Sequence, residues 1–99
     1  MPDKGWKQFE RRIAKDLGGR RVGILGKEDV EHPVFSIEVK LLKNLPKFLT
    51  GVCGQAQRNC PDGKIPLAII KEKNRNDHSA MVIMGYGDFK KLKEIGYEF

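Results

Sequence analysis

The sequence predicts an α/β fold in which a central mixed sheet of four to five strands is flanked by helices. Three observations predict this class. An amphipathic helical pattern covers residues 4–17, an alternating strand pattern covers residues 34–42, and a second helix followed by two more strands occupies most of the remainder. The length of 99 residues is enough for a single domain over residues 1–99 with a modest core.

The N-terminal helix carries a carboxylate on its apolar side. Apolar residues recur at helical spacing between Lys4 and Leu17, and Gly18-Gly19 ends the pattern. At about 100° per residue, Glu10 falls inside the apolar stripe. An unpaired buried carboxylate is costly, so Glu10 is expected to meet a cation, a metal or a metal-bound water where the helix meets the sheet. A place at the edge of the stripe with a lysine partner is the alternative.

Residues 34–42 alternate apolar and polar side chains, which places Glu38 and Lys40 on one face of a strand. A carboxylate can bind a divalent metal there, and the neighbouring ammonium can face the negative charge that develops when a P–O bond is attacked. An ordinary ion pair on the solvated face of a sheet is the alternative interpretation.

Asp29 lies in a short strand end before a proline-containing turn. If the turn places Val30 opposite Phe35, Asp29 opposes Ser36 and shares the face of Glu38. The two carboxylates are then within ~5 to 8 Å, close enough to share one metal. A slip of one residue would send Asp29 to the apolar side, and a turn residue in a charged loop is the alternative.

The second half of the chain continues the α/β pattern. After a loop at residues 43–46, we expect a helix to about Asn59, a turn at 62–64 and a strand at 65–71. A polar loop at 73–79, a strand at 80–85 and a final helix from about Asp88, as its N-cap, through Leu92 are expected to follow.

With Glu10, Asp29 and Glu38-x-Lys40 in this order, the chain resembles the PD-(D/E)XK nuclease superfamily, and within it the phage and archaeal Holliday junction resolvases. The resemblance runs from Trp6 to about Leu92. Similar stretches are Phe9-Glu10-Arg11-Arg12, Gly18-Gly19-Arg20-Arg21-Val22, Asp29-Val30-Glu31-His32, Ser36-Ile37-Glu38-Val39-Lys40, Leu45-Pro46, Gln55-Ala56, Asp62-Gly63-Lys64 and Asp88-Phe89.

This resemblance implies a restriction-endonuclease-like core and a Mg²⁺-dependent endonuclease, with Mn²⁺ as a substitute. The implied metal ligands are Glu10, Asp29, Glu38 and the carbonyl of Val39. The metal would lower the pKa of a bound water for in-line attack on phosphorus, and Lys40 would steady the developing charge. The resemblance also places Gln55, on the second helix, near the metal or the scissile strand; a surface glutamine is the alternative.

The charge pattern favours DNA as partner. Lys and Arg number 19 against 13 acidic residues, a net charge of +6 that is spread along the chain. The candidate DNA-binding residues are Arg11, Arg20, Arg21, Lys27, Lys43, Lys47 and Arg58. A four-way junction has two-fold symmetry, so a homodimer is expected. Its candidate surfaces are the second helix with Phe48, Leu49 and Val52, and the C-terminal segment with Ile95, Tyr97 and Phe99.

Two other functions stay open: a nuclease of this fold that acts on other nicked, flapped or linear DNA, and a catalytically inert DNA-binding module of the same fold. The expected compartment is the cytoplasm of a bacterial or phage-infected cell. Cys53 and Cys60 lie too far apart along a helix for a disulfide, and neither a signal peptide nor a membrane-spanning segment is predicted.

Overall fold

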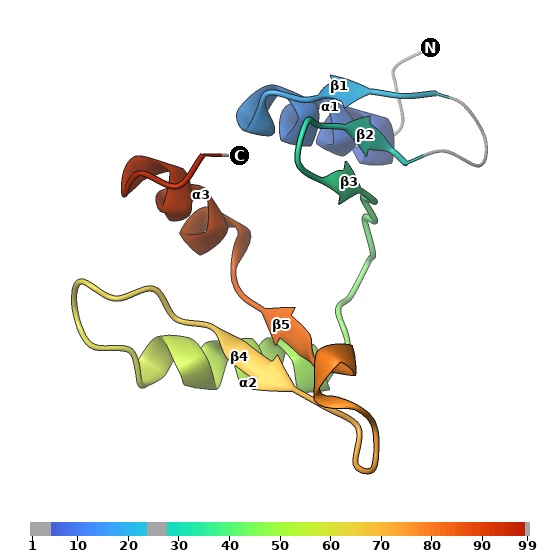
Figure 1. The fold of residues 1–99 in the computed structure, drawn as a ribbon. Helices are drawn as coiled ribbons and strands as arrows, with labels where there is room; N and C mark the ends of the chain where they lie inside the picture. Colours follow the sequence, from blue (N-terminus) through green and yellow to red (C-terminus); the bar gives the residue numbers. More distant parts are fainter. Residues whose placement is uncertain (1–4, 24–27, 99) are drawn as a thin grey trace. The chain divides into compact units, whose positions relative to one another are not determined.

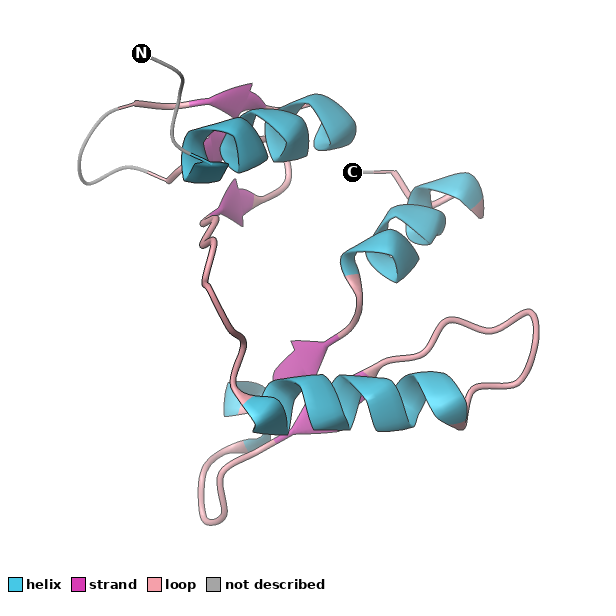
Figure 2. Ribbon diagram, turned by 180° about the vertical axis from the view of Figure 1, so that it is seen from behind, coloured by secondary structure: helices cyan, strands magenta, loops and turns pink. Residues whose placement is uncertain are grey.

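The computed structural model describes residues 5–23 and 28–98. The chain divides into two compact units, an N-terminal unit that reaches Lys43 and a C-terminal unit over Asn44–Glu98 (Figure 1). Within the described ranges there are three α-helices and two small antiparallel sheets (Figure 2). The predicted α/β class is therefore confirmed.

The N-terminal unit packs one helix against one sheet. Helix α1 (Gly5–Leu17) contacts strands β1 (Arg20–Arg21) and β2 (Val30–Glu31), and β3 (Ser36–Ile37) completes the sheet in the order β1-β2-β3. The apolar residues buried in this unit are Ile13, Ala14, Leu17 and Val30. Helix α1 agrees with the predicted helix except for its first residue, Lys4, which lies outside the described residues.

A two-glycine turn brings β1 back along the helix. Gly18 adopts φ +74°, and the N–H of Gly19 donates to the carbonyl of Ala14 at 2.8 Å, which is the hydrogen bond that closes a Schellman motif. At Gly19, a Cβ would lie 2.8 Å from Cγ1 of Val30 and closer still to the carbonyl oxygen of Glu31. The absence of a side chain at Gly19 therefore lets the turn approach β2 directly.

The register of the β2–β3 hairpin differs from the expected one. Val30 pairs with Ile37, and Glu31 pairs with Ser36, so the expectation that Val30 opposes Phe35 is wrong by two residues. A shift of two residues preserves the alternation of faces, whereas a shift of one would have exchanged them.

The hairpin turn explains the shift. Four residues, 32–35, connect the paired positions, where the expected register allowed two. Nδ1 of His32 accepts hydrogen bonds from the N–H groups of Val34 at 3.0 Å and Phe35 at 3.4 Å, and the rings of His32 and Phe35 stack with their centroids 5.3 Å apart. The imidazole thus satisfies the backbone of a longer loop.

Strand β3 is much shorter than the predicted strand over residues 34–42. Backbone pairing continues only as far as the bond from the N–H of Asp29 to the carbonyl of Ile37, at 2.9 Å. Two residues after Ile37, the N–H of Val39 donates to the side chain of Asp29 rather than to a backbone carbonyl. The ladder ends because a carboxylate replaces a strand carbonyl as the acceptor.

The C-terminal unit contains α2 (Lys47–Arg58), β4 (Ala68–Ile70), a 3₁₀ turn (Asp77–Ser79), β5 (Met81–Ile83) and α3 (Tyr86–Glu94). Strands β4 and β5 form an antiparallel pair, and α2 contacts β4. All strand pairs of the described chain are antiparallel and fall into two sheets, unlike the single mixed sheet that the sequence predicts. Within residues 5–23 and 28–98, every helix is too short or too polar to span a membrane.

Candidate functional site

The carboxylate of Asp29 is held against the segment that contains Glu38 and Lys40. Its Oδ2 accepts the backbone N–H of Val39 at 2.6 Å, the short distance of a charge-assisted bond. Asp29 is half-buried, and within the described residues its other carboxylate oxygen makes no hydrogen bond. One oxygen therefore fixes the orientation of the carboxylate while the second remains available to a ligand.

Glu38 and Lys40 flank Val39 and are both exposed. The structure shows no hydrogen bond or ion pair between either side chain and any other described residue. Their charged groups are thus accessible to a ligand. Asp29, Glu38 and the carbonyl of Val39 together offer oxygen donors only, which suits Mg²⁺, because this cation commonly takes one or two carboxylates and keeps several waters.

Glu10 is buried, as the helical pattern predicts, and it meets a cation. Its Oε2 accepts from Nε of Arg21 at 2.7 Å, and the side chains of Glu10 and Arg21 are 7% and 26% exposed. Arg21 pairs with the fully buried Val30 on the neighbouring strand. The shared face of Arg21 and Val30 is therefore the face that α1 covers.

The three predicted acidic ligands do not all converge. Asp29 lies beside Glu38 through the bond to Val39, whereas the carboxylate of Glu10 is engaged by Arg21. Among the residues that the structure describes, no group of three or more His, Cys, Asp or Glu side chains is placed to hold one metal ion. Of the predicted ligands, only Asp29 and the Val39 backbone are joined by a hydrogen bond.

Gln55 and most of the described candidate DNA-binding residues lie on the surface. Gln55 is exposed on α2 of the C-terminal unit, which begins at Lys47 and ends at Arg58. Of the candidate DNA-binding residues, Arg11, Arg20, Lys43, Lys47 and Arg58 are exposed, Arg21 is half-buried, and Lys27 lies outside the described residues.

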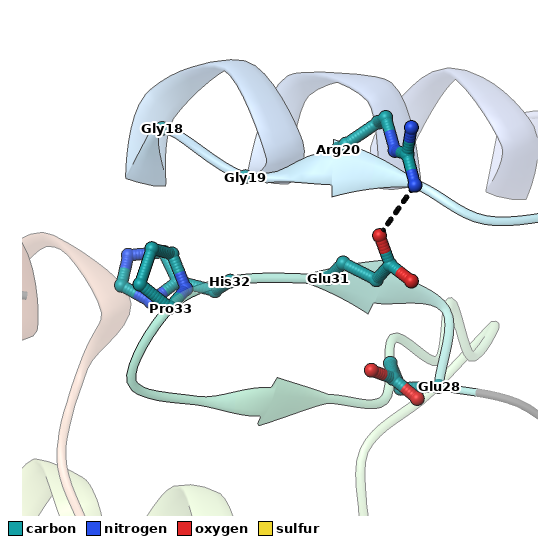
Figure 3. A pocket seen from close by; sticks show the side chains of 7 residues that line it. All are labelled: Gly18, Gly19, Arg20, Glu28, Glu31, His32 and Pro33. Atoms are coloured by element: carbon teal, nitrogen blue, oxygen red, sulfur yellow. Dashed lines mark hydrogen bonds and ion pairs between the residues drawn. The ribbon is translucent and has the colours of Figure 1, made fainter.

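A hollow of about 470 Å³ opens beside β1 and β2 (Figure 3). Arg20 turns its guanidinium to Glu31 here, at 2.7 Å, and His32 and Pro33 mark its far end at the hairpin turn. The lining residues are Gly18, Gly19, Arg20, Glu28, Glu31, His32 and Pro33. Of the predicted site residues, only Arg20 is among them. Asp29, Glu38 and Lys40 do not line this hollow, so it is distinct from the predicted metal site.

Two features escape the sequence patterns. The identity of the cation that pairs with Glu10, Arg21, depends on how β1 returns along α1. The sequence does carry one signal for a cation near the helix, because two arginines follow directly after Gly18-Gly19. The role of His32 as a turn acceptor has no spacing signature, because it depends on the hairpin register.

Comparisons with protein-family models, with curated proteins and with solved structures give no significant match to this chain.

Proposed function

We propose that this protein is a divalent-metal-dependent endonuclease that hydrolyses phosphodiester bonds in branched DNA, with a Holliday junction as its substrate. The observation that carries the proposal is the 2.6 Å bond between Asp29 and the N–H of Val39. This bond holds a second carboxylate beside Glu38-x-Lys40, as the resemblance to the PD-(D/E)XK nucleases requires. The fold proposed with this function is a restriction-endonuclease-like core.

Each group near Val39 has a role in this chemistry. Asp29, Glu38 and the carbonyl of Val39 would hold Mg²⁺ or Mn²⁺, which would supply an activated water and neutralise developing charge. The ammonium of Lys40 would face the phosphorane charge, and its exposure leaves it free to contact the phosphate. A direct metal contact by Glu10 would require its ion pair with Arg21 to open.

DNA is the partner that the charge favours. The net charge of +6 is distributed over both units, and the solvent side of α1 presents Arg11, Arg12 and Lys15. Distributed basic charge suits a polyanion that lies across a surface. Symmetric cutting of a four-way junction is simplest with a homodimer that has one Glu38-x-Lys40 site per subunit.

A nicking assay on a four-way junction with Mg²⁺ tests the proposal. We expect Lys40→Ala to lower the cleavage rate at saturating DNA by a factor on the order of 100 or more, as is typical when a group that stabilises developing charge is lost. Glu38→Gln should also prevent cleavage while DNA binding persists. Ca²⁺ should support binding without cleavage. The matched control is Lys43→Ala, an equal loss of charge outside the predicted metal site, which should alter DNA affinity and spare the rate at saturation.

A DNA-binding module without turnover is the second candidate. It is favoured by the Glu10–Arg21 ion pair, which leaves two carboxylates rather than three near Val39. Removal of metal with EDTA separates the two functions, because binding by basic residues survives it and metal-dependent hydrolysis does not. If Lys40→Ala cleaved DNA at the wild-type rate, the assignment of this site would be wrong.

A further inference from the structure

We propose that Arg21 is a phosphate-binding residue and that the buried carboxylate of Glu10 orients it. Glu10 then acts through Arg21 rather than as a metal ligand. This inference rests on the proposed action on DNA. The first observation is the gradient of burial along this pair. The side chain of Glu10 is 7% exposed and that of Arg21 is 26% exposed, so the guanidinium reaches from a buried carboxylate to the surface.

The second observation is the atom that Arg21 uses. Its Nε donates to Glu10, and its terminal nitrogens make no hydrogen bond to any other described residue. Arginine has five N–H donors in a planar fork that matches the oxygens of a phosphate. Because Nε is fixed at 2.7 Å from Oε2 of Glu10, the remaining donors are held in one orientation and are free to receive an anion.

The third observation is the position of Arg21 in the sheet. Strand β1 is an edge strand, and the N–H of Val22 donates to the carbonyl of Asp29 at 2.9 Å. Arg21 therefore lies on the edge strand next to Val22, whose backbone pairs with that of Asp29, the residue that precedes β2. We expect a nucleic acid bound at this edge to place one phosphate on Arg21.

Arg20, the neighbouring residue, lacks these properties. It pairs with Glu31 at 2.7 Å, but the two side chains are 80% and 47% exposed. An ion pair between exposed groups is weak and orders its members poorly. Arg20 thus provides a matched control: the same residue type, one position away, in an ion pair of equal length without a buried anchor.

The test measures DNA binding in EDTA, where neither metal nor cleavage contributes. Arg21→Lys and Arg20→Lys both preserve the net charge, but lysine lacks the planar fork. We expect Arg21→Lys to weaken binding at every salt concentration while the slope of log K against log salt stays unchanged, because lysine keeps the charge that releases counterions but lacks the fork that grips a phosphate. Arg20→Lys should weaken binding less than Arg21→Lys, because Arg20 has no buried anchor that orients its donors. An equal loss of affinity in the two variants, or no loss in either, would overturn the inference.

A second measurement separates this inference from the proposed function. Inorganic phosphate is titrated into the ¹⁵N-labelled protein while the arginine Nε–H signals are followed by NMR. We expect the Arg21 signal to shift with phosphate and to be protected from exchange without it. A shift in a protein that cleaves no DNA would support the anion site and refute the nuclease. Cleavage without any shift of the Arg21 signal would refute the anion site alone.

Glu10→Gln distinguishes the two roles of Glu10. The amide oxygen of glutamine still accepts a hydrogen bond from Nε of Arg21, so the positioning role predicts an unchanged Mg²⁺ requirement for cleavage. If Glu10→Gln raised the Mg²⁺ concentration needed for cleavage and left DNA binding in EDTA unaltered, Glu10 would be a metal ligand, and the positioning role would be overturned.

Discussion

The Asp29 carboxylate contributes to the local fold as well as to the proposed chemistry, because one of its oxygens ends the β3 ladder at Val39. Asp29→Asn retains an oxygen that can accept this N–H, and it removes the charge. We expect it to lower metal-dependent cleavage by a factor on the order of 100, as loss of a metal-ligand interaction often does, with little change in stability.

Asp29→Ala is the matched comparison, since it also removes the acceptor. It should lower the free energy of unfolding by a further ~1 kcal/mol, the net value of one hydrogen bond. Urea unfolding of both variants measures the difference. Equal stability of the alanine and asparagine variants would show that the bond to Val39 contributes nothing to the fold.

The ion pair of Glu10 and Arg21 places a charge almost entirely inside the N-terminal unit. Glu10→Ala would leave the half-buried guanidinium without its partner, and we expect a loss of about 3 kcal/mol in the free energy of unfolding. The double variant Glu10→Leu/Arg21→Met should recover most of this loss, because an apolar pair of similar volume needs no charge compensation. Urea unfolding would contradict this account if the double variant were as unstable as the single one.

At the level of elements, the turn between α1 and β1 depends on two glycines for different reasons. Gly19→Ala would bring a Cβ to 2.8 Å from Val30, and we expect a loss of about 2 to 3 kcal/mol because the neighbours are backbone and a buried side chain. Gly18→Ala meets no atom within 4 Å but must adopt φ +74°, which costs ~1 kcal/mol.

Gly51 in α2 is the control for both, because it has open space around its Cα and a helical conformation. Gly51→Ala should raise stability by about 0.5 to 1 kcal/mol. Thermal unfolding of the three variants should rank them Gly51→Ala, Gly18→Ala, Gly19→Ala from most to least stable, and an order in which Gly19→Ala is not the least stable would refute the close approach inferred at Gly19.

Helices were predictable from sequence because their signals are local. The apolar stripe and the glycine stop place the end of α1 at Leu17, and the 100° rule of helix geometry puts Glu10 in the stripe, where it is found buried. Strands were overestimated because their length depends on partners. The pattern over residues 34–42 is regular, yet only Ser36–Ile37 pairs, since the side chain of Asp29 takes the N–H of Val39.

The burial and exposure of the candidate site residues were predictable to the same extent. Periodicity identified Glu10, Glu38 and Lys40 as unusual, but the cation that meets Glu10 depends on which residue of β1 faces the helix. The hairpin register also had to be known, and it is set by a four-residue loop with a histidine acceptor rather than by alternation. Contacts between elements were therefore the information that the sequence patterns lacked.

For the whole molecule, basic charge on both units predicts binding that depends on many phosphates. Junction binding in EDTA should weaken steeply as salt increases, with little dependence on base sequence. Titrations with junctions of different sequence at several salt concentrations measure both properties. A flat salt dependence, or affinity that follows base sequence, would exclude a surface that reads phosphate positions alone.

Assembly is the last property that the proposed function requires. Large apolar side chains are 63% exposed at Phe48 on α2 and at Tyr97 near the C-terminus, and either could contribute to a dimer interface. Burial of such side chains in a symmetric interface would stabilise a small domain and bring two sites to one junction. We expect sedimentation to show a dimer that makes paired, symmetric nicks in a four-way junction.

Phe48→Glu and Tyr97→Glu form a matched pair, because each places the same charge on one of the two candidate surfaces. The variant at the true interface should sediment as a monomer and leave single nicks, whereas the other should remain a dimer with paired nicks. The assay should compare a four-way junction with a flap, a nicked duplex and a linear duplex at several protein concentrations. Equal cutting of all four substrates by a wild-type monomer would contradict junction resolution and favour the general nuclease, since neither symmetry nor branch geometry would then affect the cleavage rate.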